Sequence, residues 1–179
     1  SVADSNAFGN GLPNAPFNTI QDGIDAAGQG DSVLVAIGTY FENVILDKKD
    51  VVVIGENRDS TIVDGQHSGS VFTLENPTYN NEDVCTIENF TIQNGFAFGG
   101  GGIHVDHFSP NLINLNVINN TAGNEGGGIQ CSNGNPTFDG LFIAENYSGS
   151  GAGIYLEGQA HLTITNSTIV NNSANNYGG

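Results

Sequence analysis

Basic residues are nearly absent from this sequence of 179 residues: Lys and Arg together number 3, Asp and Glu number 19, and the formal net charge is −16. Nucleic acids and anionic membrane surfaces attract clustered positive charge, so this deficit predicts no nucleic-acid partner. The sequence also lacks an uninterrupted apolar run of about 18 residues, so we expect no membrane insertion. Neutral sugars or cations are the expected ligands.

A composition suited to helices is lacking as well. Charged residues make up only 12% of the chain, Met and Trp are absent, and Gly and Asn number 26 and 25. Gly loses backbone entropy in a helix, and Asn side chains compete for the hydrogen bonds of its backbone. Such a composition suits short strands joined by tight turns. Its acidic, Asn-rich character also favours an extracellular or cell-surface location.

Two sequence markers repeat along the second half of the chain. Gly-Ile pairs begin at Gly102, Gly128 and Gly153, in steps of 26 and 25 residues. A fixed period over several copies indicates a solenoid of stacked repeats. The second marker is an Asn that closes a short apolar run, and it recurs in steps of 26 at Asn94, Asn120, Asn146 and Asn172. We expect these four side chains to form a hydrogen-bonded ladder from repeat to repeat.

Apolar residues alternate within each repeat, as in Ile103/Val105, Ile129/Cys131 and Ile154/Leu156. This alternation is the periodicity of a β-strand. Three or so short strands in each repeat leave no room for a helix between them. The sequence therefore predicts an all-β fold, a right-handed single-stranded parallel β-helix of about six coils.

A short amphipathic helix is expected over residues 19–27, where Ile20, Ile24 and Ala27 are apolar. It would cap the N-terminal end of the solenoid and cover an otherwise unpaired coil edge. We expect a single β-helix domain over residues 1–179, comprising an N-terminal cap (1–30), irregular coils (31–98) and regular coils (99–179) that continue beyond the end of the chain.

The two cysteines, Cys85 and Cys131, stand at alternation positions that inward apolar residues occupy elsewhere, Leu162 and Leu156. Buried free thiols are therefore expected in place of a disulfide. Their separation is not a multiple of the repeat length, which argues against direct stacking of the two thiols. A disulfide across the lumen is the alternative that the sequence leaves open.

Four N-terminal segments, residues 17–27, 30–35, 38–44 and 61–65, resemble the opening of pectin-lyase-like right-handed β-helix proteins, which the pectin methylesterases share. The later Gly-Gly-x-Ile and apolar-x-x-Asn units are similar to repeats of bacterial polymorphic outer-membrane proteins. The resemblance covers nearly the whole chain and implies the fold. It does not imply one chemistry, because this scaffold hosts lyases, hydrolases, esterases, epimerases, adhesins and structural spacers.

The resemblance also implies what a catalytic member would need. Lyases of this kind use Arg or Lys as the base, often with bound calcium, and this chain offers only Arg58, Lys48 and Lys49. Nothing nearby supplies a second catalytic partner, so we expect these to be solvated turn residues. The motifs of pectin methylesterases, polygalacturonases and alginate epimerases have no counterpart in the sequence.

Strand alternation sends the neighbours of the inward residues to the outer face. There we expect two adjacent columns of ligand-binding side chains: His104, Asp106, Gln130, Ser132, Tyr155 and Glu157. Asp106 and Glu157 would lie two coils apart, roughly 10 Å, near the upper end of the carboxylate separation in inverting glycosidases. They are the catalytic candidates, whereas Tyr155 could stack on a sugar. Plain solvation of the outer face is the simpler interpretation.

Calcium is the metal that suits turns rich in Asp, Asn and backbone carbonyls, although the fold requires no cofactor. The acidic candidates are Asp64, Glu82, Asp83 and Glu125. They match no periodic calcium-binding motif, so solvated acidic turns are the alternative.

These features together favour a secreted or cell-surface β-helix repeat module with a structural, adhesive or glycan-binding role. Its partners would be a polysaccharide or cell-surface glycan, and further copies of itself joined end to end through the open coil edge. The alternative is the N-terminal part of a polysaccharide-active enzyme, a lyase or glycoside hydrolase, whose catalytic coils lie elsewhere.

Overall fold

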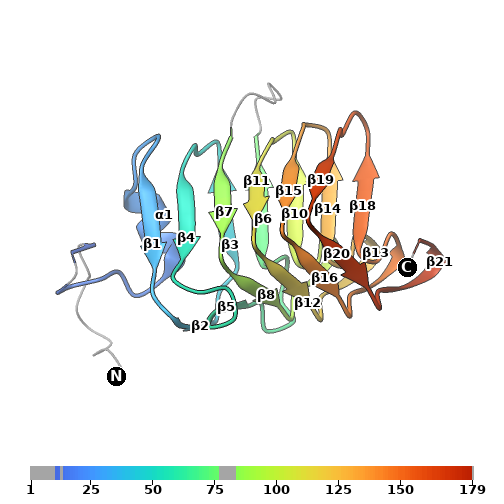
Figure 1. Cartoon of the computed structure of the whole chain (residues 1–179), viewed down its shortest axis with the longest axis horizontal. Helices are drawn as coiled ribbons and strands as arrows, with labels where there is room; N and C mark the ends of the chain where they lie inside the picture. The colour runs from blue at the N-terminus through green and yellow to red at the C-terminus, as the bar shows by residue number, and fades with distance from the viewer. Residues whose placement is uncertain (1–10, 13, 77–83, 179) are drawn as a thin grey trace.

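The chain winds into a parallel β-helix, seen side-on in Figure 1 as a row of stacked coils. The computed structural model describes residues 11, 12, 14–76 and 84–178. Each strand pairs in parallel with the equivalent strand of the next coil, which confirms the predicted all-β solenoid. Two of the sheets have six strands, which corresponds to about five full turns where the sequence predicts about six coils, and the other two have five and four.

The four sheets are named here in the order in which a coil visits them. The first sheet contains β1 (Ser32–Val35), β4 (Val52–Gly55), β7 (Thr86–Glu88), β11 (Asn111–Ile113), β15 (Thr137–Asp139) and β19 (Thr163–Thr165). The second sheet contains β2 (Gly38–Tyr40), β5 (Thr61–Asp64), β8 (Thr91–Gln93), β12 (Asn116–Ile118), β16 (Phe142–Ala144) and β20 (Thr168–Val170). The third sheet contains β9 (Phe96–Gly99), β13 (Thr121–Glu125), β17 (Tyr147–Ser150) and β21 (Ser173–Tyr177). The fourth sheet contains β3 (Val44–Asp47), β6 (Phe72–Glu75), β10 (Ile103–Asp106), β14 (Ile129–Ser132) and β18 (Ile154–Glu157).

The third sheet is the main departure from the predicted coil, which had about three strands. Its strands β13 and β17 contain Gly123 and Gly149, residues of low β-propensity, so the sequence does not show strand alternation there. Pairing with the coils above and below holds these segments extended in spite of their composition. The register of this sheet shifts after Ala122, as expected of a bulge.

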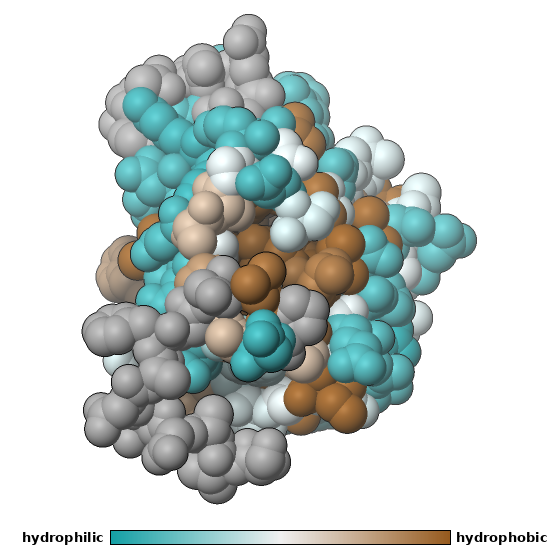
Figure 2. Space-filling model, turned by 90° about the vertical axis from the view of Figure 1, so that its left-hand side faces the viewer, coloured by the Kyte–Doolittle hydropathy of each residue, from teal (hydrophilic) through white to brown (hydrophobic). Residues whose placement is uncertain are grey.

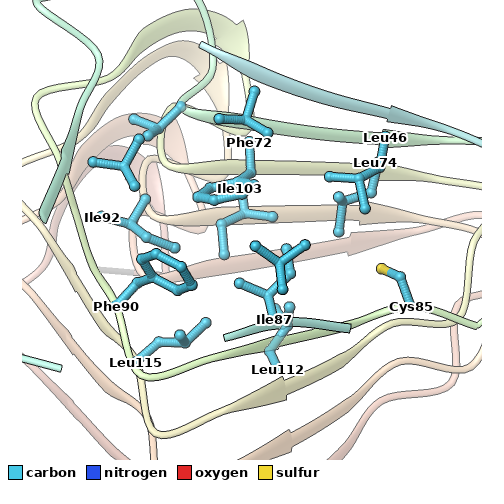
Figure 3. Close-up of a cluster of buried hydrophobic side chains, with 14 of the residues drawn as sticks. Leu46, Phe72, Leu74, Cys85, Ile87, Phe90, Ile92, Ile103, Leu112 and Leu115 are labelled. Carbon is cyan, nitrogen blue, oxygen red and sulfur yellow. The ribbon is translucent and has the colours of Figure 1, made fainter. Parts of the chain in front are cut away.

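Inward apolar side chains from the sheets fill the lumen of the solenoid. Figure 3 shows Ile87 of β7, Phe90 of the turn before β8, Ile92 of β8 and Ile103 of β10 pointing into the lumen, and none of them is exposed to solvent. The rings of Phe90 and Phe72 pack with their centroids 6.1 Å apart, in tilted geometry. This stacked core is the main source of stability, because each coil buries its apolar residues only against its neighbours.

Helix α1 (Ile20–Ala26) closes the N-terminal end, as the sequence predicts for residues 19–27. Thr19 caps the helix, because its Oγ1 accepts a hydrogen bond from the backbone N–H of Asp22 at 3.0 Å. The carboxylate of Glu42 accepts the N–H of Ile20 at 2.9 Å. At the other end, Nζ of Lys49 donates to the carbonyl of Asp25 at 3.0 Å. Both helix ends are thus satisfied by residues of the first coil.

The end face that carries α1 and β1 is turned toward the viewer in Figure 2, where hydrophobic side chains gather near its centre. Ile20 and Ile24 on the inner face of the helix are buried. A hollow of about 610 Å³ opens between the helix and β1. Leu34 and Phe41 of the first coil stay exposed.

Left-handed backbone at the turns explains why Asn is so abundant. Asn tolerates positive φ better than other non-Gly residues, because its short polar side chain satisfies local hydrogen bonds. One column of such turns joins the first sheet to the second, at Asn89, Asn114, Gly140 and Asn166, and another joins the second sheet to the third, at Asn94, Asn119, Glu145 and Asn171.

Cys85 and Cys131 are both buried free thiols, as the sequence predicts. Burial raises the pKa of the Cys131 thiol to about 12 and that of Cys85 well above its ordinary value. Both side chains therefore act as small apolar core residues.

Candidate functional site

The predicted outward residues stand in strict register on the fourth sheet. His104, Gln130 and Tyr155 pair with one another on adjacent strands, and Asp106, Ser132 and Glu157 pair in the same way. These six residues are called the polar columns below.

Direct hydrogen bonds link the polar columns to one another. His104 Nδ1 lies 3.1 Å from Gln130 Oε1, and Gln130 Nε2 donates to Glu157 Oε1 at 3.1 Å. Ser132 Oγ donates to the same oxygen of Glu157. The chain of donors therefore runs from His104 through Gln130 to Glu157, and it fixes the orientation of these side chains before any ligand arrives.

The middle of the polar columns is more buried than a solvated outer face would be. Gln130 is 7% exposed and Ser132 is 8% exposed. The cause is the Gly-rich turn from the third sheet, which lies directly on the outer side of the fourth. A Cβ at Gly99 would overlap Gln130 Oε1, and one at Gly126, where φ is 65°, would lie 2.8 Å from Gln130 Cβ. These glycines let the backbone approach the polar columns closely, so simple solvation does not describe Gln130.

Tyr155 bends toward the preceding coil, where its hydroxyl donates to Glu125. This hydrogen bond, together with the negative charge of Glu125, raises the pKa of the Tyr155 hydroxyl above its ordinary value. The ring thus lies at the corner between the third and fourth sheets. It is only partly buried, which leaves it free to contact a ligand.

The acidic column is longer than the two carboxylates predicted from the sequence. In register with Asp106 stand Glu75 of β6 and, one coil further, Asp47 of β3. The irregular spacing of the early coils hides this alignment. A signal does exist, because four of the five strands of the fourth sheet end in a carboxylate after an apolar-x-apolar triplet, and only Ser132 departs from it.

Asp106 and Glu157 do not face each other directly. Ser132 stands between them in the register and donates to Glu157, so the two carboxylates are separated by two strand spacings, roughly 10 Å. Asp106 instead contacts His107, whose Nδ1 lies 2.7 Å from Asp106 Oδ1. This arrangement gives each carboxylate a different neighbour, His107 for Asp106 and Ser132 for Glu157.

Two of the three basic residues considered as lyase bases, Arg58 and Lys49, have structural partners and are not simply solvated turn residues. The guanidinium of Arg58 donates to Asn114 Oδ1 at 3.0 Å and pairs with Asp59 at 3.4 Å. It lines a hollow of about 360 Å³ over the second sheet, together with Asn116 and Phe142. Lys49 caps helix α1. Neither residue lies on the fourth sheet beside the polar columns.

The acidic metal candidates are dispersed. Glu82 and Asp83 lie outside the described residues. Glu125 accepts the hydroxyl of Tyr155. Asp64 is 8% exposed, and both of its oxygens accept N–H donors. Within the described part of the chain, no three His, Cys, Asp or Glu side chains gather where they could hold a metal ion.

Hydrogen bonding shapes the titration of Asp64. Its Oδ2 accepts from Gln93 Nε2 at 2.9 Å and from Asn94 Nδ2 at 2.8 Å, and its Oδ1 accepts the backbone N–H of Gln66 at 2.9 Å. Burial by itself raises the pKa of this carboxyl, but the three hydrogen bonds and the charge of His67 outweigh burial and leave the pKa below its ordinary value.

Three of the four predicted ladder residues form one hydrogen-bonded row, which is buried at Asn120 and Asn146 and half-buried at Asn172. Asn146 Oδ1 accepts from Asn120 Nδ2 at 3.1 Å, and Asn172 Oδ1 accepts from Asn146 Nδ2 at 2.9 Å. The assignment of Asn94 to this row is wrong. The step between β8 and β12 is 25 residues, not 26, so Asn94 aligns with the left-handed Asn119 and Gly95 takes the ladder position. Its N–H donates to Asn120 Oδ1 at 2.9 Å.

Comparison with known proteins identifies the fold family. A family profile described as the right-handed beta helix region matches residues 78–178, more than half of the chain. No curated protein and no solved structure matches the chain. Within the described residues, no helix is long and apolar enough to cross a membrane.

Proposed function

Because the chain belongs to the family of right-handed β-helix proteins, we propose that it is a binding module that contacts glycans at the polar columns without changing them chemically. The observation that carries this proposal is the fixed hydrogen-bonded row from His104 through Gln130 to Glu157. Side chains that are already oriented lose little conformational entropy when a sugar hydroxyl binds them. Tyr155 beside the row supplies an aromatic surface of the kind on which sugar rings pack.

Charge supports a neutral glycan as the ligand. The protein carries a formal charge of −16, and Asp47, Glu75 and Asp106 align on neighbouring strands of the same face. Polyuronates would be repelled from this surface unless a cation bridged them. The acidic, Asn-rich composition supports a location outside the cell or on its surface, where neutral glycans occur.

A binding role is favoured over catalysis by the partners of the charged side chains. Glu157 accepts two hydrogen bonds at one oxygen, and Ser132 separates it from Asp106 in the register. The guanidinium of Arg58 is held by Asn114 over the second sheet. The enzyme alternative therefore needs catalytic groups other than these.

The test is a titration of the whole chain with neutral and uronate oligosaccharides, with and without calcium, run beside an assay for new reducing ends and unsaturated uronates. We expect saturable binding of a neutral oligosaccharide, weakened by His104→Ala, and no product. Turnover that is abolished by Asp106→Asn or Glu157→Gln would overturn the proposal and make the two carboxylates catalytic. The change Ser150→Ala, at a half-buried residue outside the polar columns, serves as the control for handling and folding.

End-to-end assembly is a second candidate function, favoured by the last coil. Leu156, Ile164 and Ile169 are 41%, 41% and 47% exposed, although their register partners Cys131, Phe138 and Ile143 are buried. Residues 152–178 also contain no Lys, Arg or Pro, the residues that usually protect a sheet edge. We therefore propose that another copy can stack on this edge.

Light scattering over a range of concentrations tests this assembly. The protein should form oligomers whose mass rises with concentration, and Ile164→Lys should keep it monomeric. A wild-type protein that stays monomeric at every concentration would exclude assembly through this edge, without bearing on glycan binding at the polar columns.

A further inference from the structure

The outer face of the third sheet exposes aromatic rings that the proposed function does not yet use. Phe96 and Phe98 on β9 are 53% and 80% exposed, and Tyr147 on β17 is 42% exposed. Ala97, between the two Phe residues, is half-buried and Ser148, next to Tyr147, is buried, so the aromatic rings occupy the outward positions. Phe96, Phe98 and Tyr147 are called the aromatic row below.

The spacing of the aromatic row follows from the register. Thr121 stands between Phe96 and Tyr147, so these two rings are separated by two strand spacings, roughly 10 Å. One disaccharide unit of an extended β-1,4-linked chain has about this length. A glycan lying along the solenoid axis could therefore place alternate sugar rings on Phe96 and Tyr147, with the Thr121 hydroxyl between them.

The surroundings of the aromatic row are small and nearly uncharged. Gly123 of β13 and Gly149 of β17 carry no side chain beside it. The third-sheet strands β9, β13, β17 and β21 contain no Lys or Arg, and Glu125 is their single carboxylate. That carboxylate accepts the Tyr155 hydroxyl, which joins the aromatic row to the polar columns around the Gly-rich corner.

We propose that the aromatic row docks a neutral β-1,4-linked polysaccharide, whose ring faces stack on Phe96 and Tyr147 while its hydroxyls reach the neighbouring polar columns. The inference rests on the proposed glycan-binding function and deepens it by naming the ligand class and a second contact surface. Aromatic rings attract the apolar faces of neutral sugars, and the acidic protein disfavours anionic chains.

The experiment measures binding of cellohexaose and of a galacturonate hexamer by the whole chain. Phe96→Ala and Tyr147→Ala remove exposed rings, so both variants should fold, which the melting temperature verifies. Phe41→Ala is the matched control, because Phe41 is also an exposed ring, 64% exposed, and lies in the first coil. We expect each aromatic-row variant to weaken cellohexaose binding by about tenfold. The control should bind like the wild type, and the galacturonate hexamer should bind more weakly than cellohexaose.

The outcomes separate this inference from the function on which it rests. If cellohexaose binds and His104→Ala weakens it, but Phe96→Ala and Tyr147→Ala do not, the aromatic row is overturned and the polar columns remain. If neither oligosaccharide binds the wild type, both proposals fall. If the two aromatic-row variants lower the oligomeric mass and leave cellohexaose binding unchanged, the row is a contact between copies of the chain, and the glycan inference is overturned.

Discussion

Replacing Asn146 by Ala should remove the central rung of the Asn row. Its side chain accepts from the backbone N–H and the Nδ2 of Asn120 at 2.9 and 3.1 Å, and donates to Val117 O and Asn172 Oδ1, both at 2.9 Å. Asn120 is fully buried, so its N–H would lose its partner without gaining water. With about 1 kcal/mol for each neutral bond, less some relaxation, the cost is about 3 kcal/mol.

A loss of that size corresponds to a fall in melting temperature of about 10 °C for a chain of this length. Differential scanning calorimetry or urea unfolding followed by circular dichroism measures it. Ser150→Ala is the control, because Ser150 is a half-buried residue at the end of β17, outside the Asn row, and its change should stay within about 0.5 kcal/mol. Equal melting temperatures for the two variants would refute the idea that the Asn row stabilises the stack.

Three further predictions concern stability and reactivity. Asp64 has a lowered pKa in the folded state, so its contribution to folding stability is present above the unfolded pKa of about 3.9 and is lost as pH falls through the lower folded value. Urea unfolding at several pH values should therefore show that the free energy of unfolding falls more steeply below about pH 4 in the wild type than in Asp64→Asn. The thiol of Cys131 has a folded pKa of about 12, so its contribution to folding stability is present below the unfolded pKa and is lost as pH rises toward about 12. A thiol reagent at about pH 8 should label Cys131 only after the protein unfolds. Rapid labelling of the native protein would contradict the burial of this thiol. Phe138→Ala should cost about 3–5 kcal/mol by calorimetry, because Phe138 is 1% exposed in the stacked core, and a cost like that of Ser150→Ala would show that the lumen is loosely packed.

The regular coils could be predicted from the sequence because their period is visible in residues that have few alternatives. Gly102 and Gly128 recur where a side chain would collide with the next coil, and Ile103 and Ile129 mark the inward positions. The third sheet could not be predicted. Its strands carry Gly123 and Gly149, and neighbouring coils, not local preference, hold them extended.

The candidate site was predictable in its alignment but not in its surroundings. Strand alternation places His104, Gln130 and Tyr155 in one column. The burial of Gln130 depends on a turn from another sheet, and no local pattern indicates that contact. A constant step of 26 places Asn94 in the Asn row wrongly, because the step between β8 and β12 is 25 residues.

The most direct test of the central claim is a titration of isotope-labelled protein with cellohexaose, followed by nuclear magnetic resonance. We predict that the amide signals of His104, Gln130 and Tyr155 shift together and saturate with one affinity, while signals of the first sheet stay fixed. Signals that do not move at any concentration of the oligosaccharide, or that move equally over the whole chain, would contradict a glycan-binding role for the polar columns.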